Sequence, residues 1–102
     1  MQIQVSGDDT ISRQARTYAE YRVFGVLAHL AGAADAIQAR VALRYRPGRP
    51  KSGSVTCTVA VILAGVPALR IRTRAPHAYA AINRAVERLR SATLAPSTPP
   101  RT

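Results

Sequence analysis

The sequence has few of the residues from which most enzyme and metal sites are built. Its 102 residues include one cysteine, Cys57, and two histidines. A single cysteine excludes an internal disulfide and a cage of cysteines around a metal ion. The five acidic residues are scattered, and none has the spacing of a catalytic dyad or a metal site. We therefore expect no catalytic residue, no metal and no cofactor.

Long hydrophobic runs are also missing. No apolar stretch is long enough to cross a bilayer, and the opening MQIQVSGDD lacks the basic and apolar regions of a secretory signal. Together with the scarcity of cysteine, these features predict a cytoplasmic protein with no membrane partner. The length suits one compact domain, and a hydrophobic fraction of 47% supports a core.

Negative charge is scarce. Fifteen lysines and arginines stand against five acids, a formal net charge of +10, and Lys51 is the only lysine. Such an excess opposes compaction by self-repulsion, and a polyanionic partner is its natural explanation. The planar arginine side chain suits phosphate and can stack on bases. A genome biased toward arginine, with a solvated basic surface, is the alternative, but this bias does not explain the shortage of acids.

Two segments have the periodicity of amphipathic helices. The first is predicted from about Ile11 to Leu30, with Asp8–Thr10 as the preceding turn and helix cap. Its apolar face consists of Ala15, Ala19, Val23, Val26 and Leu30. Gly25, inside this helix, predicts close packing against a sheet or a slight break. The second helix opens at Pro76 and runs to Arg90, with Tyr79, Ile82, Val86 and Leu89 as its apolar stripe.

Four segments alternate between apolar and polar residues, as half-buried strands do. They are residues 3–7, 36–46, 54–63 and 68–74. The second is expected to bury Ile37, Ala39, Val41, Leu43 and Tyr45, and the third to bury Cys57 as an inert thiol. The order predicts an α+β fold, β-α-β-β-β-α, with two helices packed on one face of a four-stranded sheet. Residues 1–94 would form this domain, and the Pro/Ser/Thr-rich residues 95–102 a disordered tail.

The other face of this sheet is predicted to be basic. It would display Arg40, Arg44, Arg70, Arg72 and Arg74 on neighbouring strands. Because like charges that face each other across strands are destabilising, such a cluster indicates a site for anions. Arg46, Arg49 and Lys51, in the basic Pro/Gly loop RPGRPKSG, could extend this surface as a flexible arm.

Three motifs resemble one family, the ribosome hibernation-promoting factors, also called ribosome-associated inhibitor or sigma-54 modulation proteins. MQIQVSG resembles the opening strand and glycine of the family. ISRQARTYAEYR is similar to its first helix, with Arg16 and Arg22 at basic positions. AYAAINRAVERL is similar to its second helix, with the run Tyr79–Ile82 and with Arg88 at a basic position. The resemblance covers about residues 1–92 and points to a short, single-domain form.

The resemblance implies a β-α-β-β-β-α protein that binds rRNA of the small ribosomal subunit in the channel for mRNA and tRNA. Arg16, Arg22 and Arg88, and with less support Arg84, would then contact rRNA phosphates. Tyr18 and Tyr79 are expected in the core, whereas Tyr21 lies off the apolar stripe and is a weak candidate for base stacking. No small-molecule substrate is expected, and the protein would be a monomer or a weak homodimer. A general binder of double-stranded RNA or DNA is the main alternative, and a small enzyme with an unrecognised site is another.

Overall fold

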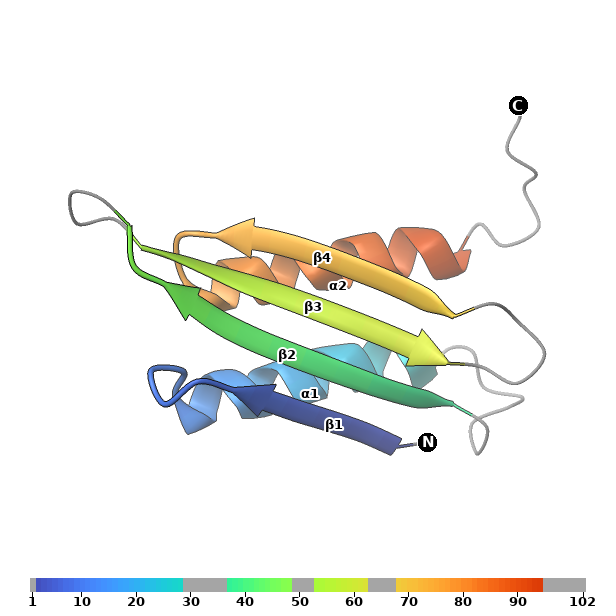
Figure 1. Ribbon diagram of the computed structural model, residues 1–102. Helices are drawn as coiled ribbons and strands as arrows, with labels where there is room; N and C mark the ends of the chain where they lie inside the picture. The colour runs from blue at the N-terminus through green and yellow to red at the C-terminus, as the bar shows by residue number, and fades with distance from the viewer. Residues whose placement is uncertain (1, 29–36, 49–52, 63–67, 95–102) are drawn as a thin grey trace, which may run out of the picture.

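The computed structural model describes residues 2–28, 37–48, 53–62 and 68–94 of the chain. Its elements are β1 (Gln2–Gly7), α1 (Arg13–Leu27), β2 (Gln38–Arg46), β3 (Ser54–Ile62), β4 (Leu69–Ala75) and α2 (Ala78–Leu94), shown in Figure 1. The predicted order β-α-β-β-β-α is confirmed. The tail at 95–102, together with Leu30, Arg49, Lys51 and Leu63, lies outside the described residues.

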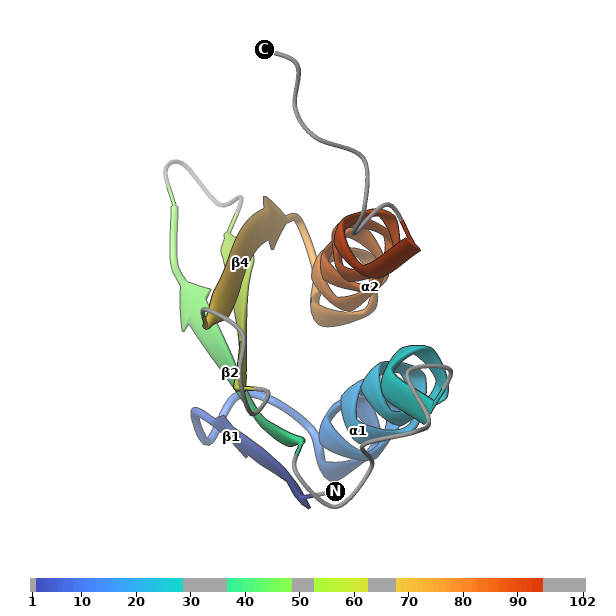
Figure 2. The same cartoon turned by 90° about the vertical axis from the view of Figure 1, so that its right-hand side faces the viewer.

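The four strands form one mixed sheet in the order β1-β2-β3-β4. β1 pairs with β2 in parallel, and the other two pairings are antiparallel. Both helices cover the same face, with α1 beside β1 and β2 and α2 beside β3 and β4, so the opposite face is open (Figure 2). The predicted α+β architecture is therefore confirmed.

The core lies between the sheet and the helices, where the period of two in the strands meets the helical stripes. The strands bury Ala39, Val41, Leu43, Val55, Cys57, Val59, Val61 and Ile71, and Ile37 is buried just before β2. The helices bury Ala15, Ala19, Val23, Val26, Leu27, Ala81, Ile82, Ala85, Val86 and Leu89. A buried hydrogen bond of 2.8 Å from Thr73 Oγ1 to the Ala81 carbonyl joins β4 to α2. Most positions predicted to face the core do so.

The predicted cap of the first helix is wrong. Ser12 is the N-cap of α1, and its hydroxyl accepts a 3.0 Å hydrogen bond from the Ala15 N–H. Asp8 instead completes the sheet edge where β1 ends, because its Oδ2 accepts a 2.7 Å hydrogen bond from the Tyr45 N–H on β2. The carboxylate thereby satisfies a strand donor that β1 is too short to reach.

Three further predictions about the packing of single residues are wrong. Tyr45, near the end of β2, has an exposed ring that lies against Gly53. Tyr79 is 41% exposed, since the α2 stripe that faces the sheet is shifted toward the alanines at 81 and 85. Gly25 is exposed, and a Cβ there would meet no atom within 4 Å, so close packing does not explain this glycine.

Candidate nucleic-acid interface

The register of the sheet places arginines on both sides of β3. On the open face, Arg40 and Arg44 of β2 pair with Ala60 and Thr56 of β3. On the other side of β3, the same two residues pair with Arg70 and Arg74 of β4. Arg72 lies between these two positions, beside Thr58. We call this surface of Arg40, Arg44, Arg70, Arg72 and Arg74 the open-face cluster.

The cluster is not arranged as the sequence predicted. Its arginines lie on β2 and β4, which are separated by β3 and are not neighbours. With strands ~4.8 Å apart, arginines on opposite sides of β3 are about 10 Å apart at the backbone. Direct like-charge pairing across adjacent strands is therefore avoided. The small side chains of Thr56, Thr58 and Ala60 instead form a strip between two basic rows.

The threonine at one end of this strip, Thr56, shows how the arginines lie. Thr56 is only 8% exposed although it lies on the face without helices. Its partners on both sides are Arg44 and Arg74, and long arginine stems cover neighbouring surface while their charged ends stay in water. All five arginines of the cluster are exposed, and within the described residues no side-chain hydrogen bond or ion pair holds their guanidinium groups. Their donors are available to an anion.

Two arginines of α2 extend this basic surface around β4, an edge strand. Arg84 Nη1 donates a 2.6 Å hydrogen bond to the Arg74 carbonyl, and Arg88 Nη1 donates a 3.4 Å bond to the Arg72 carbonyl. The structure therefore brings Arg84 and Arg88 next to the open-face cluster. The same bonds engage backbone acceptors of an edge strand, which helps to prevent pairing with another chain.

The other two helical arginines predicted to bind RNA have structural contacts. Arg16 is half-buried, and its Nη2 donates to the carbonyls of Gly7 (3.5 Å) and Asp8 (3.0 Å). Arg22 Nη1 donates to the Tyr18 hydroxyl and to Asn83 Oδ1, between the two helices. Neither lies in the open-face cluster. Their contact with RNA stays a prediction, whereas their hydrogen bonds stabilise the fold.

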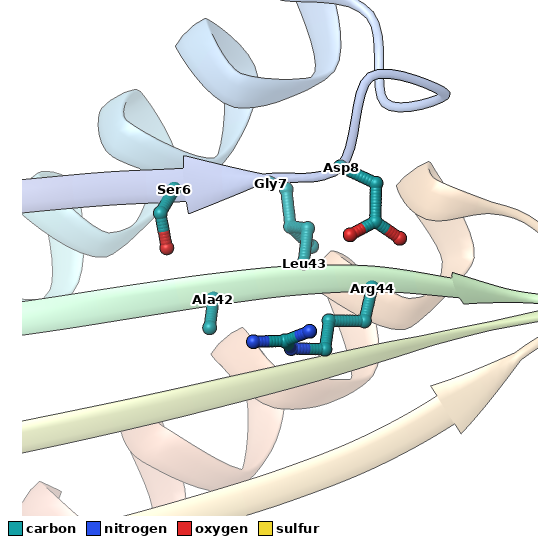
Figure 3. Close-up of a pocket in the computed structure, with 6 residues that line it drawn as sticks. All are labelled: Ser6, Gly7, Asp8, Ala42, Leu43 and Arg44. Atoms are coloured by element: carbon teal, nitrogen blue, oxygen red, sulfur yellow. The ribbon is translucent and has the colours of Figure 1, made fainter.

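Figure 3 shows a small pocket on the open side, at the end of β1. Its volume is about 130 Å³, and Ser6, Gly7, Asp8, Ala42, Leu43 and Arg44 line it. The Asp8 carboxylate is engaged with the Tyr45 N–H and places negative charge beside the arginine. This pocket suits water better than a phosphate, so we place the anion surface on the arginine rows.

The remaining candidates are divided between the described and undescribed parts of the chain. Arg46 is exposed at the end of β2, paired with Ser54, and continues the basic row of that strand. Arg49 and Lys51 fall outside the described residues.

The described residues contain no group of three histidine, cysteine or acidic side chains that could hold a metal ion. The Nδ1 of His77 accepts a 3.4 Å bond from the Ala80 N–H at the start of α2.

The single thiol is buried in the core. Cys57 on β3 is 1% exposed, and this burial raises the pKa of the thiol from 9.0 to about 12. A neutral thiol shielded from solvent is a poor nucleophile. The prediction of a buried cysteine is confirmed. None of the helices within the described residues is long and apolar enough to span a bilayer.

The fold and the open face define a basic α+β domain, and solved structures match it over most of its length. The N-terminal domain of Protein Y from Thermus thermophilus has a TM-score of 0.71 and 26% sequence identity, covering 89% of this chain and 93% of its own. A ribosomal subunit interface protein from Coxiella burnetii has a TM-score of 0.67 and 16% identity, covering 89% of this chain and 91% of its own.

The Thermus protein is a member of the hibernation-promoting factor family, so the resemblance to this family that the sequence motifs predict is confirmed. The likeness to the Coxiella protein concerns the fold alone. No protein-family model and no curated protein sequence matches the chain.

Proposed function

We propose that this protein is a ribosome-associated factor that binds rRNA of the small subunit in the channel for mRNA and tRNA. Its action would be occlusion: an arginine-rich domain in this channel competes with mRNA and tRNA. The open-face cluster would contact the phosphates, together with Arg84 and Arg88 beside it and with Arg46 at the end of β2. Arg49 and Lys51, which lie outside the described residues, would add to these contacts. In this account the protein is cytoplasmic, acts without catalysis and needs no cofactor.

The observation that carries this proposal is the pair of basic rows on β2 and β4. Five exposed guanidinium groups that have no partner among the described residues leave a repulsive field unless an anion neutralises it. A phosphate backbone supplies closely spaced charges, and arginine binds phosphate through two parallel hydrogen bonds. The structural neighbours, named as Protein Y and as a ribosomal subunit interface protein, favour rRNA as the particular polyanion.

The chain would act as a monomer or a weak homodimer. The carbonyls of Arg72 and Arg74 on the edge strand β4 are engaged by α2, which disfavours dimerisation through this edge. Sedimentation of the free protein at several concentrations checks this, and a dimer that persists on dilution would contradict it.

Co-sedimentation with purified small ribosomal subunits tests the proposal, with random duplex RNA as a competitor. We expect salt-sensitive binding to the subunit that a mass excess of duplex RNA displaces poorly. Equal displacement by any polyanion would overturn the ribosomal proposal and make the protein a general binder of double-stranded RNA or DNA. A second assay places mRNA and initiator tRNA on the subunit first, and occlusion predicts that their presence reduces binding.

A further inference from the structure

The outer surface of the two helices carries a cluster of aromatic side chains. Three of the four tyrosines of the chain, Tyr18, Tyr21 and Tyr79, line a groove of about 470 Å³ between α1 and α2. Tyr21 is 70% exposed and Tyr79 is 41% exposed. Large exposed aromatic rings gathered in one groove indicate a contact surface.

Contacts within the protein fix the floor of this groove. The rings of Tyr18 and Tyr79 lie with their centroids 5.0 Å apart and their planes tilted by 57°. The Tyr18 hydroxyl donates to Asn83 Oδ1, and the Arg22 guanidinium lies 5.8 Å from the centroid of the Tyr18 ring. Because these groups already hold one another, a ligand would meet an ordered surface.

Tyr21 also lines a second groove. This one has a volume of about 360 Å³ and is lined by Tyr21, Arg22, Phe24, Gly25, Val26 and Arg90. The absence of a side chain at Gly25 helps to leave this groove open. Tyr21 therefore lies between two hollows, and its ring is available to planar groups.

The charged side chains that line the two grooves are all basic. Arg13 lines the first groove, Arg22 and Arg90 line the second, and no carboxylate is among the described residues that line either. A flat aromatic surface bordered by cations fits an unpaired nucleobase with its flanking phosphates. It does not fit a duplex, whose bases are already stacked on one another.

We propose that Tyr21 is a stacking residue for an unpaired base of single-stranded RNA, seated in the groove that it shares with Tyr79. The inference rests on the proposed function, since it adds base contacts on the helical side to phosphate contacts on the sheet. The two surfaces lie on opposite sides of the domain, which suits a binding site that surrounds the protein.

Tyrosine fluorescence tests this inference directly, because the chain has no tryptophan. The wild-type protein is titrated at low salt with a single-stranded oligonucleotide of ten uridines and with a duplex of the same length. We expect the single strand to quench the tyrosine emission. Tyr21→Leu should lose most of this quenching and bind the single strand about ten-fold more weakly, with little change for the duplex.

Two matched variants control for fold and for hydrophobicity. Tyr21→Phe keeps an aromatic ring and should retain the affinity, whereas Tyr21→Leu keeps only apolar surface. Tyr45→Leu removes the one tyrosine outside the groove and should retain most of the quenching. Equal affinity of Tyr21→Leu and the wild type for the single strand, or an equal loss in Tyr45→Leu, would overturn the inference.

The outcome also separates this inference from the proposed function. Quenching that depends on Tyr21, in a protein that does not bind small subunits, would leave the stacking site and remove the ribosomal role. Subunit binding in which Tyr21→Leu behaves as the wild type, with no quenching by the oligonucleotide, would leave the ribosomal role and refute the stacking site.

Discussion

The Tyr18 hydroxyl donates a 2.6 Å hydrogen bond to Asn83 Oδ1 and so joins α1 to α2. Arg22 Nη1 donates to both atoms, at 3.1 Å to the Tyr18 hydroxyl and 3.3 Å to Asn83 Oδ1, so the three side chains form one hydrogen-bonded cluster. This cluster lies beneath the groove of Tyr21 and Tyr79. Helix packing and the shape of the proposed stacking site therefore depend on the same contacts.

Tyr18→Phe tests the contribution of this hydroxyl to stability. The substitution removes the hydroxyl and keeps the ring contact with Tyr79. The hydroxyl donates one hydrogen bond to Asn83 and accepts one from Arg22, so we expect the free energy of unfolding in urea to fall by about 1–2 kcal/mol, from a net value of about 1 kcal/mol for each bond. Tyr45→Phe removes a hydroxyl from the exposed ring beside Gly53 and should change it by less than about 0.5 kcal/mol. Equal effects of the two variants would contradict a special role for the Tyr18 hydroxyl.

Gly25→Ala is expected to stabilise the protein. The residue lies inside α1, is exposed, and offers open space to a Cβ. Alanine in a helix interior is favoured over glycine by up to about 1 kcal/mol. Gly7→Ala is the contrasting variant, because a Cβ there would lie 3.2 Å from the Ile11 Cβ and 3.4 Å from the Arg16 Nε. Thermal melting should show a higher Tm for Gly25→Ala and no gain for Gly7→Ala. A lower Tm for Gly25→Ala would show that the glycine has a structural role after all.

The buried thiol predicts a dependence of stability on alkaline pH. Folding raises the pKa of Cys57 to about 12 from 9.0, so the unfolded chain loses this proton first as the pH rises. The contribution of the neutral thiol is complete below pH 9.0 and is lost progressively as the pH approaches 12.

Urea unfolding of the wild type and of Cys57→Ala between pH 8 and pH 11 measures this contribution. Other groups titrate equally in both proteins, so we expect the wild type to lose more stability than the variant over this range. Parallel curves would refute the assignment. In the folded protein a disulfide reagent should also react much more slowly with the thiol than in urea.

The alternation of residues in the strands, together with the apolar stripes of the helices, was enough to predict the order of the elements and the two-layer architecture. Val41 and Arg44 lie on opposite faces of β2, as the period of two requires, and the two helices cover the apolar face. Helix ends were less predictable, because Ser12 and Asp8 are both residues that suit a helix cap. Asp8 instead accepts a hydrogen bond from the Tyr45 N–H on β2, and this contact cannot be read from the local sequence. The exposure of Tyr79 depends on the angle at which α2 meets the sheet, which its own periodicity does not specify.

The sequence was enough to predict which arginines lie on the open face, but not how they are arranged on it. The face that carries Arg40 and Arg72 follows from alternation, but the position of β3 between their strands follows from the sheet order. The bonds from α2 to the carbonyls of β4 join elements that are adjacent only in the fold. Local sequence likewise does not show that Tyr21 and Tyr79, on different helices, line one groove.

The open-face cluster is the part of the protein proposed to contact a phosphate backbone. The most direct test is the salt dependence of small-subunit binding for three proteins: the wild type, a variant with Arg44, Arg72 and Arg74 changed to glutamine, and a variant with the same three residues changed to lysine. The lysine variant keeps the charge, so it controls for disruption of the sheet.

Each phosphate contact contributes about 0.7–0.9 to the slope of log Kobs against log salt concentration. If all three arginines contact phosphates, the glutamine variant should bind more weakly with a slope smaller by about two to three, and the lysine variant should keep the slope of the wild type. An unchanged slope in a folded glutamine variant would contradict the claim and place the RNA contact elsewhere on the protein.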